Sequence, residues 1–206
     1  MAFSLGLTES MRSMWASTTS TGEIFRALMR RASVIVDDPN PVAVATDGGV
    51  PMGGVLRPED EQVESPAFFV WAGADWMSAP LQRIQVIKGW IDADGETHES
   101  VRDVVCADGL EVDPNTLRCP DNRASVDISS CRPSGEGGTG QLMMAWQDED
   151  FDASQDAFYY VRVIQNPTCR WSTYDAIRLG IEPDPRVPAT IRERAWSSPI
   201  WIDPPS

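Results

Sequence analysis

Residues 83–91 (RIQVIKGWI), 92–96 (DADGE) and 100–106 (SVRDVVC) decide the fold class of this chain. The two outer runs are apolar or alternating, a pattern that is typical of β-strands. The segment between them contains Asp94-Gly95, a dipeptide that tolerates positive φ and favours a tight turn. These residues therefore predict an antiparallel β-hairpin.

Short runs of the same kind recur along the chain, and turn-forming residues separate them. They lie at residues 34–36, 67–72, 124–128, 141–146, 157–164 and 194–202. Sixteen prolines and fifteen glycines are spread along the sequence, which argues against long helices. We therefore expect a mainly β fold of about eight strands, a β-sandwich with Ig-like or jelly-roll topology.

Two short helices interrupt this pattern of strands. The sequence STGE at 20–23 matches a capping box, and the apolar residues that follow share one face. They predict an N-terminal helix at about residues 21–31. Ser172 as N-cap and Gly180 as a stop predict a short connecting helix at 172–179.

Composition and charge limit the classes of function. The formal net charge of −14 would repel a phosphate backbone, which excludes nucleic-acid binding. No stretch approaches the roughly 20 consecutive apolar residues of a membrane span. Residues 1–19 show no clear period, so we expect a poorly ordered arm before a single β-rich domain at 20–206.

Four cysteines lie in polar, turn-rich surroundings: Cys106, Cys119, Cys131 and Cys169. Their even number favours disulfides, and their spacing matches no common zinc pattern. Cys106 and Cys119 bracket a polar segment that a bridge would close, at about 3 kcal/mol in the chain-entropy model. We therefore expect a periplasmic or extracellular protein. The N-terminal MAFSLGL has no basic signal-peptide region, so a leader would lie upstream of this chain.

Residues that carry chemistry are few. His98 is the only histidine and lies in a polar stretch, so we expect a solvated strand residue rather than a member of a catalytic triad. The GEGGTG segment at 135–140 lacks the strand before it and the helix after it that a dinucleotide site needs, and predicts a loop. We expect no catalytic residue, no metal and no cofactor, and hence no enzyme in this chain by itself.

Two kinds of ligand site stay open. Asp148, Asp150 and Asp152 have the spacing that opens a calcium loop, but Ala153 and Tyr159 stand where an EF-hand needs Gly and Glu. A looser calcium site and a solvated acidic loop are the alternatives. Eight tryptophans lie mostly in or beside predicted strands. They would be core residues or, if exposed in a row, a platform that stacks on sugars.

Several segments, taken in chain order, resemble one protein family. They are EIFRAL (23–28), GVPMGG (49–54), PLQRIQVIKGW (80–90), DFD (150–152), AFYYVRV (157–163), NPTCRW (166–171) and ERAWSSPIW (193–201). Together they resemble the family named domain of unknown function 3604, over about residues 20–202.

The resemblance implies a role within a larger protein. Members of this family are usually longer, and their N-terminal part looks like a metal-dependent hydrolase of the polymerase-and-histidinol-phosphatase type. The His and Asp ligands of that part match no position here. The resemblance thus implies a non-catalytic accessory β-domain of an exported hydrolase, with a hydrolase domain encoded upstream as partner. The alternatives are a stand-alone exported binding module for a carbohydrate or another polar ligand, and a complete small enzyme.

The chain departs from the family pattern at two places. ASVIVDD at 32–38 stands where the family usually has a YATSGP-like segment, which leaves open how the first helix joins a catalytic half. Family members often carry a cysteine near the positions of Met143 and Met144, which implies that Cys131 lacks its usual partner. A bridge from Cys131 to Cys169, which lies in the matched NPTCRW motif, is left as a guess.

Four arginines of these segments lie beside Trp or Tyr: Arg83, Arg162, Arg170 and Arg194. Guanidinium groups in such positions stack on rings and pair with carboxylates such as Asp150, Asp152 or Glu193. We expect these arginines to serve structure or docking. The rival hypothesis is an anion site that reaches toward a phosphate in the hydrolase half.

Overall fold

The protein is mainly β in the computed structural model, which describes residues 42–46, 50–58, 65–75 and 77–204. Its strands are β1 (Val42–Thr46), β2 (Val55–Leu56), β3 (Ala67–Gly73), β4 (Leu81–Ile91), β5 (Thr97–Cys106), β6 (Ser125–Asp127), β7 (Arg132–Ser134), β8 (Gln141–Gln147), β9 (Ala157–Gln165), β10 (Thr168–Cys169), β11 (Thr190–Ile191), β12 (Arg194–Trp196) and β13 (Ile200–Ile202). A 3-10 turn, η1 (Ala107–Gly109), and a helix, α4 (Trp171–Leu179), accompany them. The predicted arm at 1–19, helix at 21–31 and strand at 34–36 lie outside the described residues.

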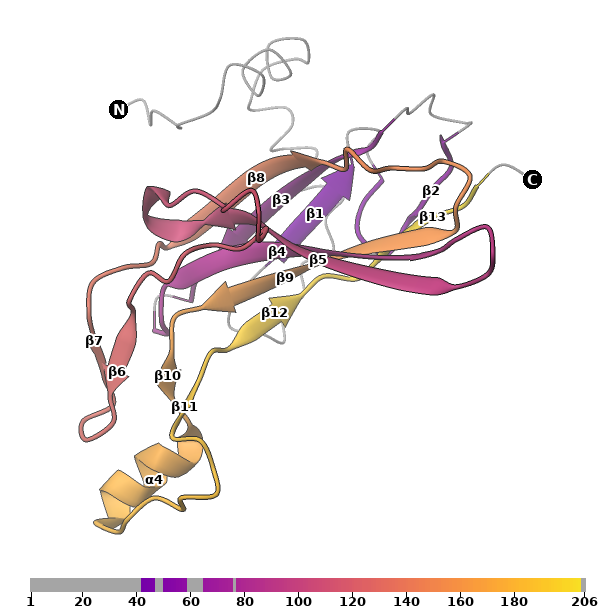
Figure 1. Ribbon diagram of the computed structural model, residues 1–206. Coiled ribbons are helices and arrows are strands. Elements are labelled where there is room, and N and C mark those ends of the chain that lie inside the picture. The colour runs from indigo at the N-terminus through magenta and orange to yellow at the C-terminus, as the bar shows by residue number, and fades with distance from the viewer. Residues whose placement is uncertain (1–41, 47–49, 59–64, 76, 205–206) are drawn as a thin grey trace.

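The larger sheet has the strand order β2-β13-β9-β4-β5, and β12 pairs with another part of β9 (Figure 1). Its neighbours are antiparallel, except for β2 and β13, which are parallel. The strands β4 and β5 form the predicted hairpin. Gly95 lies in its turn at φ +83°, a conformation that residues with a Cβ rarely adopt.

The smaller sheet contains β1, β3 and β8 in that order, all antiparallel. Its buried residues share one hydrophobic core with those of the larger sheet. The core includes Phe68, Val70, Ala72 and Leu142 from the smaller sheet and Ile84, Val86, Val104, Tyr159, Val161, Val163, Ala195, Ile200 and Ile202 from the larger. Successive residues of a strand point to opposite faces, so the other face of the larger sheet carries a different set of side chains.

One end of the sheets carries a projection, residues 168–191, that we term the distal arm. It contains β10, α4 and β11 and extends away from the two sheets, on the same side as the β6–β7 hairpin (Figure 1). A disulfide joins Cys131, in the turn of that hairpin, to Cys169 at the end of β10. This pairing confirms the hypothesis of a Cys131–Cys169 bridge. Its sequence separation of 38 corresponds to about 4 kcal/mol in the chain-entropy model.

The helix α4 begins earlier than the sequence predicts. Arg170, rather than Ser172, is its N-cap residue. The backbone N–H of Arg170 and the hydroxyl of Thr173 both donate to the carbonyl of Ala189, which fixes the start of the helix against the end of the arm. Gly180 ends the helix at φ +64°, as predicted. No helix in the described ranges has both the length and the apolar character needed to cross a membrane.

The predicted strand at 194–202 is two strands in the structure, β12 and β13. Between them, the backbone N–H of Val161 donates to the hydroxyl of Ser197 at 2.9 Å, where a continuous ladder would use a carbonyl. Pro199 follows and has no N–H to donate. The ladder is therefore interrupted, and β12 and β13 pair with different parts of β9.

Candidate functional site

The outer face of the larger sheet, opposite the core, collects arginines from three strands. Arg83 of β4 pairs with Ile164 of β9, which pairs in turn with Arg194 of β12. The neighbouring cross-strand row consists of Asp103, Gln85, Arg162 and Trp196, each paired with the one before it. Residues paired directly across strands share a face. Three of the four arginines considered from the sequence thus lie on one surface.

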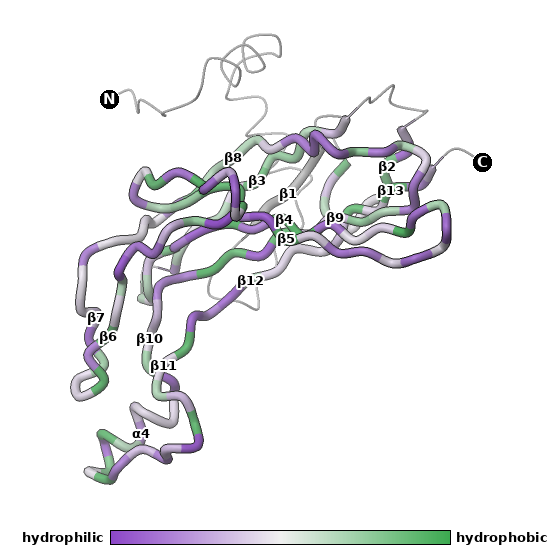
Figure 2. The backbone as a smooth tube through the Cα atoms, in the orientation of Figure 1, coloured by the Kyte–Doolittle hydropathy of each residue, from purple (hydrophilic) through white to green (hydrophobic). Residues whose placement is uncertain are grey.

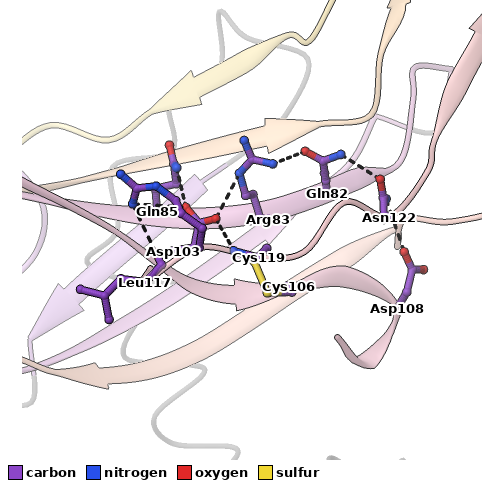
Figure 3. The surroundings of a disulfide bond; sticks show 10 residues. Gln82, Arg83, Gln85, Asp103, Cys106, Asp108, Leu117, Cys119 and Asn122 are labelled. Carbon is purple, nitrogen blue, oxygen red and sulfur yellow. Dashed lines mark hydrogen bonds and ion pairs between the residues drawn. A yellow bond between two sulfur atoms is a disulfide. The ribbon is translucent and has the colours of Figure 1, made fainter. Parts of the chain in front are cut away.

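Asp103 is the centre of this surface, and its side chain is only 1% exposed. Its carboxylate accepts hydrogen bonds from Gln85 Nε2 and from the backbone N–H of Cys119. A guanidinium nitrogen of Arg83 lies 3.4 Å from one of its oxygens (Figure 3). A guanidinium nitrogen of Arg118 lies 4.0 Å from the other oxygen. A buried carboxylate surrounded by donors in this way fixes the positions of the groups around it.

Arg118 reaches this surface through the Cys106–Cys119 disulfide, which joins the two cysteines paired in the sequence analysis. Cys106 pairs with Arg83 in the β4–β5 hairpin. The bridge therefore brings Cys119, and with it Arg118, next to Arg83. Arg118 also donates to the carbonyl of Val101. The disulfide thus places a guanidinium group on the outer face.

The charges around Arg83 are mostly positive. Burial lowers the pKa of the Arg83 guanidinium, Asp103 opposes this shift, and Arg192, Arg118 and Arg162 add to it. We term Arg83, Arg118, Arg162 and Arg192 the arginine cluster. Asp103 thus lies within 4.0 Å of two guanidinium groups, and the charges of Arg162 and Arg192 also act on Arg83, in a chain with a net charge of −14. Like charges held this close repel each other, and an anion bound among them would relieve the repulsion.

Hydrogen bonds hold the cluster in place. Arg83 donates to Gln82 Oε1, and Gln82 donates to Asn122 Oδ1 at 2.8 Å (Figure 3). Arg162 donates from Nε to Gln85 Oε1 at 2.7 Å. The two terminal nitrogens of Arg162 make no hydrogen bond to any residue that the structure describes. The cluster is therefore anchored through some of its donors and leaves others for a ligand.

The remaining two arginines considered from the sequence lie outside the cluster. Arg194 is exposed on β12, which pairs only with β9 among the described strands. Arg170 is the N-cap residue of α4 in the distal arm. Its Nε is buried and has no hydrogen-bond partner among the described residues. The structure thus brings Arg83 and Arg162 together and places Arg170 elsewhere.

A cavity of about 630 Å³ opens near the turn of the β4–β5 hairpin. Its lining includes Trp90, His98, Glu99, Asp156, Phe158 and Trp201. The ring centroids of Phe158 and Trp201 are 5.4 Å apart, and the His98 ring stacks on Trp90. His98 is exposed, as predicted, and its Nε2 lies 2.6 Å from Asp92. The cavity thus combines aromatic faces with carboxylates.

Asp148 is buried rather than part of a solvated or calcium-binding loop. Its Oδ2 lies 2.6 Å from Lys88 Nζ and accepts a hydrogen bond from the Tyr159 hydroxyl at 2.7 Å. Asp150 and Asp152 pair with other side chains. The three carboxylates therefore have separate partners. Within the described ranges, no group of three or more His, Cys, Asp or Glu side chains is arranged to hold a metal ion.

Some of the described tryptophans pack against the core, and others are exposed on the surface. Trp90 and Trp146 are half-buried and pack against the core. Trp171, Trp196 and Trp201 are 76%, 46% and 48% exposed. Trp171 belongs to the distal arm, whereas the other two lie on the outer face. Among the tryptophans that the structure describes, the exposed rings thus do not form a single row.

Arg118 and Arg192 belong to the cluster, although the sequence predicts no role for either. Arg118 had a signal, because the predicted hairpin and the predicted Cys106–Cys119 bridge together place it near Arg83. No local sequence pattern around Arg192 indicates that it belongs to the cluster. It precedes β12, and the pairing of that strand with β9 depends on contacts between distant segments.

Comparison with known proteins adds one finding. The family model described as "Protein of unknown function (DUF3604)" matches residues 25–204, which include both described sheets and the whole arginine cluster. No curated protein and no solved structure gives a significant match. The family resemblance of the strand segments is thereby confirmed. The chain belongs to the DUF3604 family of proteins of unknown function.

Proposed function

We propose that this chain is a non-catalytic accessory β-domain that docks onto a metal-dependent hydrolase domain encoded upstream. The proposal includes a β-sandwich with Ig-like or jelly-roll topology and a periplasmic or extracellular location. Two disulfides support an oxidising compartment. The resemblance to longer family members supports the choice of partner.

The exposed apolar surface of the distal arm carries this proposal. Trp171, Tyr174 and Ile177 are 76%, 42% and 40% exposed, and their spacing places them side by side along α4. Thr173 and Ala176 lie on another side of the helix and are buried. The helix lies at the tip of the arm, away from the two sheets, where hydrophobic and hydrophilic residues alternate along the chain (Figure 2). Large apolar side chains exposed together mark surfaces that contact another protein.

The test is binding of the purified chain to the separately expressed N-terminal part of a longer family member, measured by analytical ultracentrifugation. We expect a complex, and we expect Trp171→Ser to weaken it at least ten-fold, since an interface tryptophan contributes about 2 kcal/mol or more. Met77→Ser is the matched control, because Met77 is equally exposed but lies outside the arm. Absence of a complex, or unchanged binding by Trp171→Ser, would argue against docking through the arm.

A second candidate function, a carbohydrate-binding module, is favoured by the cavity beside the β4–β5 turn. Phe158 and Trp201 offer ring faces, and Glu99 and Asp156 offer acceptors for hydroxyl groups. Sugar sites combine these two features. Titration with maltohexaose, cellohexaose and a mannan oligosaccharide, followed by tryptophan fluorescence, tests this function. Saturable binding that Trp201→Ala abolishes and Trp196→Ala preserves would establish it, and no binding of any sugar would leave the accessory role.

A further inference from the structure

We propose that the arginine cluster on the outer face binds a tetrahedral oxyanion, that is, a sulfate or phosphate group, either free or esterified to a sugar. Arg83 and Arg118 of this cluster lie within 4.0 Å of Asp103, Arg162 donates to Gln85, which in turn donates to Asp103, and the charge of Arg192 acts on Arg83. This site is independent of the accessory function proposed above. It uses neither the distal arm nor the cavity near the turn of the β4–β5 hairpin.

The site is built by residues that hold one another in place. Asp103 is buried and is fixed by Gln85 and by the backbone of Cys119. Arg83, with 25% of its side chain exposed, and Arg118, with 47%, approach it from β4 and from the disulfide-closed loop. A ligand would therefore meet guanidinium groups that are already positioned. Such pre-organisation lowers the entropic cost of binding.

The charge distribution selects an anion. Acidic residues outnumber basic ones in this chain, 31 to 17, yet Arg83 has one carboxylate, Asp103, and three arginines among the main charges that act on it. The main charges around Arg83 therefore leave an excess of positive charge there. A doubly charged oxyanion would offset most of that excess. The planar fork of a guanidinium group matches the oxygen spacing of sulfate and phosphate.

The free donors lie where a ligand could reach them. Arg162 uses only Nε in its hydrogen bond to Gln85, so its two terminal nitrogens stay available among the described residues. Trp196 pairs with Arg162 across β12 and β9 and is 46% exposed. An aromatic ring beside an oxyanion site suits the apolar face of a sugar ring. A sugar ester would therefore use both the guanidinium groups and the ring.

Isothermal titration calorimetry of the full chain tests the proposal, with sulfate, phosphate, glucose 6-phosphate and glucose as probes at constant ionic strength set by chloride. We expect saturable binding of the oxyanions and none of glucose. Glucose 6-phosphate binding at least five-fold tighter than phosphate would identify a sugar ester as the ligand class, and equal affinities would identify the free ion. An absence of saturable binding by every oxyanion would overturn the proposal.

Matched arginine variants separate a site from general charge effects. We expect Arg162→Gln and Arg118→Gln each to weaken oxyanion binding at least ten-fold. Arg186→Gln is the control, because Arg186 is exposed and pairs with Asp184 in the distal arm, and we expect its affinity to equal that of the parent. Circular dichroism checks that each variant is folded. If Arg162→Gln does not fold, Arg118→Gln is the deciding variant, because Arg118 is exposed. Parent-like binding by Arg118→Gln, or an equal loss in Arg186→Gln, would contradict the site.

Discussion

Lys88 Nζ lies 2.6 Å from Asp148 Oδ2, and both side chains are almost completely buried. Lys88 is the only lysine of the chain and belongs to β4 of the larger sheet. Asp148 directly follows β8 of the smaller sheet. The rings of Trp90 and Tyr159 lie 5.2 and 5.6 Å from the ammonium group. The ion pair therefore connects the two sheets at the edge of the core they share.

Lys88→Met should lower the free energy of unfolding by about 3–5 kcal/mol, because it leaves Asp148 as a buried and unpaired charge. Urea unfolding followed by tryptophan fluorescence measures the change. Arg57→Met is the control, since it breaks an exposed pair with Asp203 that contributes about 0–1 kcal/mol. The prediction also requires that Asp148→Asn, added to Lys88→Met, restore part of the loss. An equal loss in the free energy of unfolding for Lys88→Met and Arg57→Met would contradict the prediction.

The same pair predicts a dependence of stability on pH. Burial raises the pKa of Asp148, but the hydrogen bonds from Lys88 and Tyr159 and the charge of Lys88 outweigh burial and hold this pKa below its ordinary value of 3.8. Its contribution to stability is therefore complete above about pH 4 and is lost as the pH falls through the folded-state pKa. Thermal unfolding between pH 7 and 2 should show a steeper acid loss for the parent than for Asp148→Asn. Parallel curves would rule out this role of Asp148.

Gly89→Ala should destabilise the protein by about 1–3 kcal/mol, as overpacking does. A Cβ at Gly89 would overlap the ring of Phe158, which would have to move. Both residues line the cavity near the turn of the β4–β5 hairpin. Gly140→Ala is the control, because a Cβ there meets no atom within 4 Å. Calorimetric melting should therefore give a lower Tm for Gly89→Ala alone. A Tm equal to that of the parent would mean that the Phe158 ring moves aside without a loss of stability, and would contradict the prediction.

Cleavage of the distal arm should depend on the Cys131–Cys169 bridge. Peptide mapping under non-reducing conditions is expected to find this bridge and Cys106–Cys119. In a variant with Ser at 131 and 169, trypsin should cut after Arg178 and Arg186 several times faster than in the parent, because the arm loses its covalent tie to the β6–β7 hairpin. A variant with Ser at 106 and 119 should keep the parent rate at these two arginines. Equal acceleration in both variants would show global rather than local loosening.

The accessory role predicts that the purified chain alone does not hydrolyse p-nitrophenyl phosphate in the presence of Mn²⁺ or Zn²⁺. An activated water would need a ligand cluster supplied by the partner domain. Turnover that persists through a second, independent purification would contradict the accessory role. The oxyanion site would be unaffected by that result, because binding and hydrolysis are measured separately.

Local patterns in the sequence were sufficient for β3, β4, β5, β8 and β9, but no predicted strand covers β1, which pairs with β3. The hairpin around Gly95 and the strand at 157–164 have a period or a turn residue that acts within a few positions. Asp148 shows where such reasoning fails. It lies among acidic residues that suggest a solvated loop, but its partner Lys88 is 60 positions away and becomes its neighbour only when the two sheets pack.

The arginine cluster was predictable only in part, for the same reason. Arg83 and Arg162 stand in strands that the pattern predicts, but the pairing of these two strands is known only from the structure. Arg118 requires the hairpin register and the disulfide to be considered together, and Arg192 requires the pairing of β12 with β9. Neither of these last two arginines has a neighbour in sequence that signals an anion site. Non-local contacts decide which charges meet.

The Cys131–Cys169 bridge also closes a covalent loop that passes through both sheets. The chain between its two sulfur atoms contains β8, which belongs to the smaller sheet, and β9, which lies in the middle of the larger one. Because this covalent loop passes through both sheets, unfolding of either sheet would leave the distal arm tied to the β6–β7 hairpin. The position of α4 relative to that hairpin is therefore restricted even in a partly unfolded molecule.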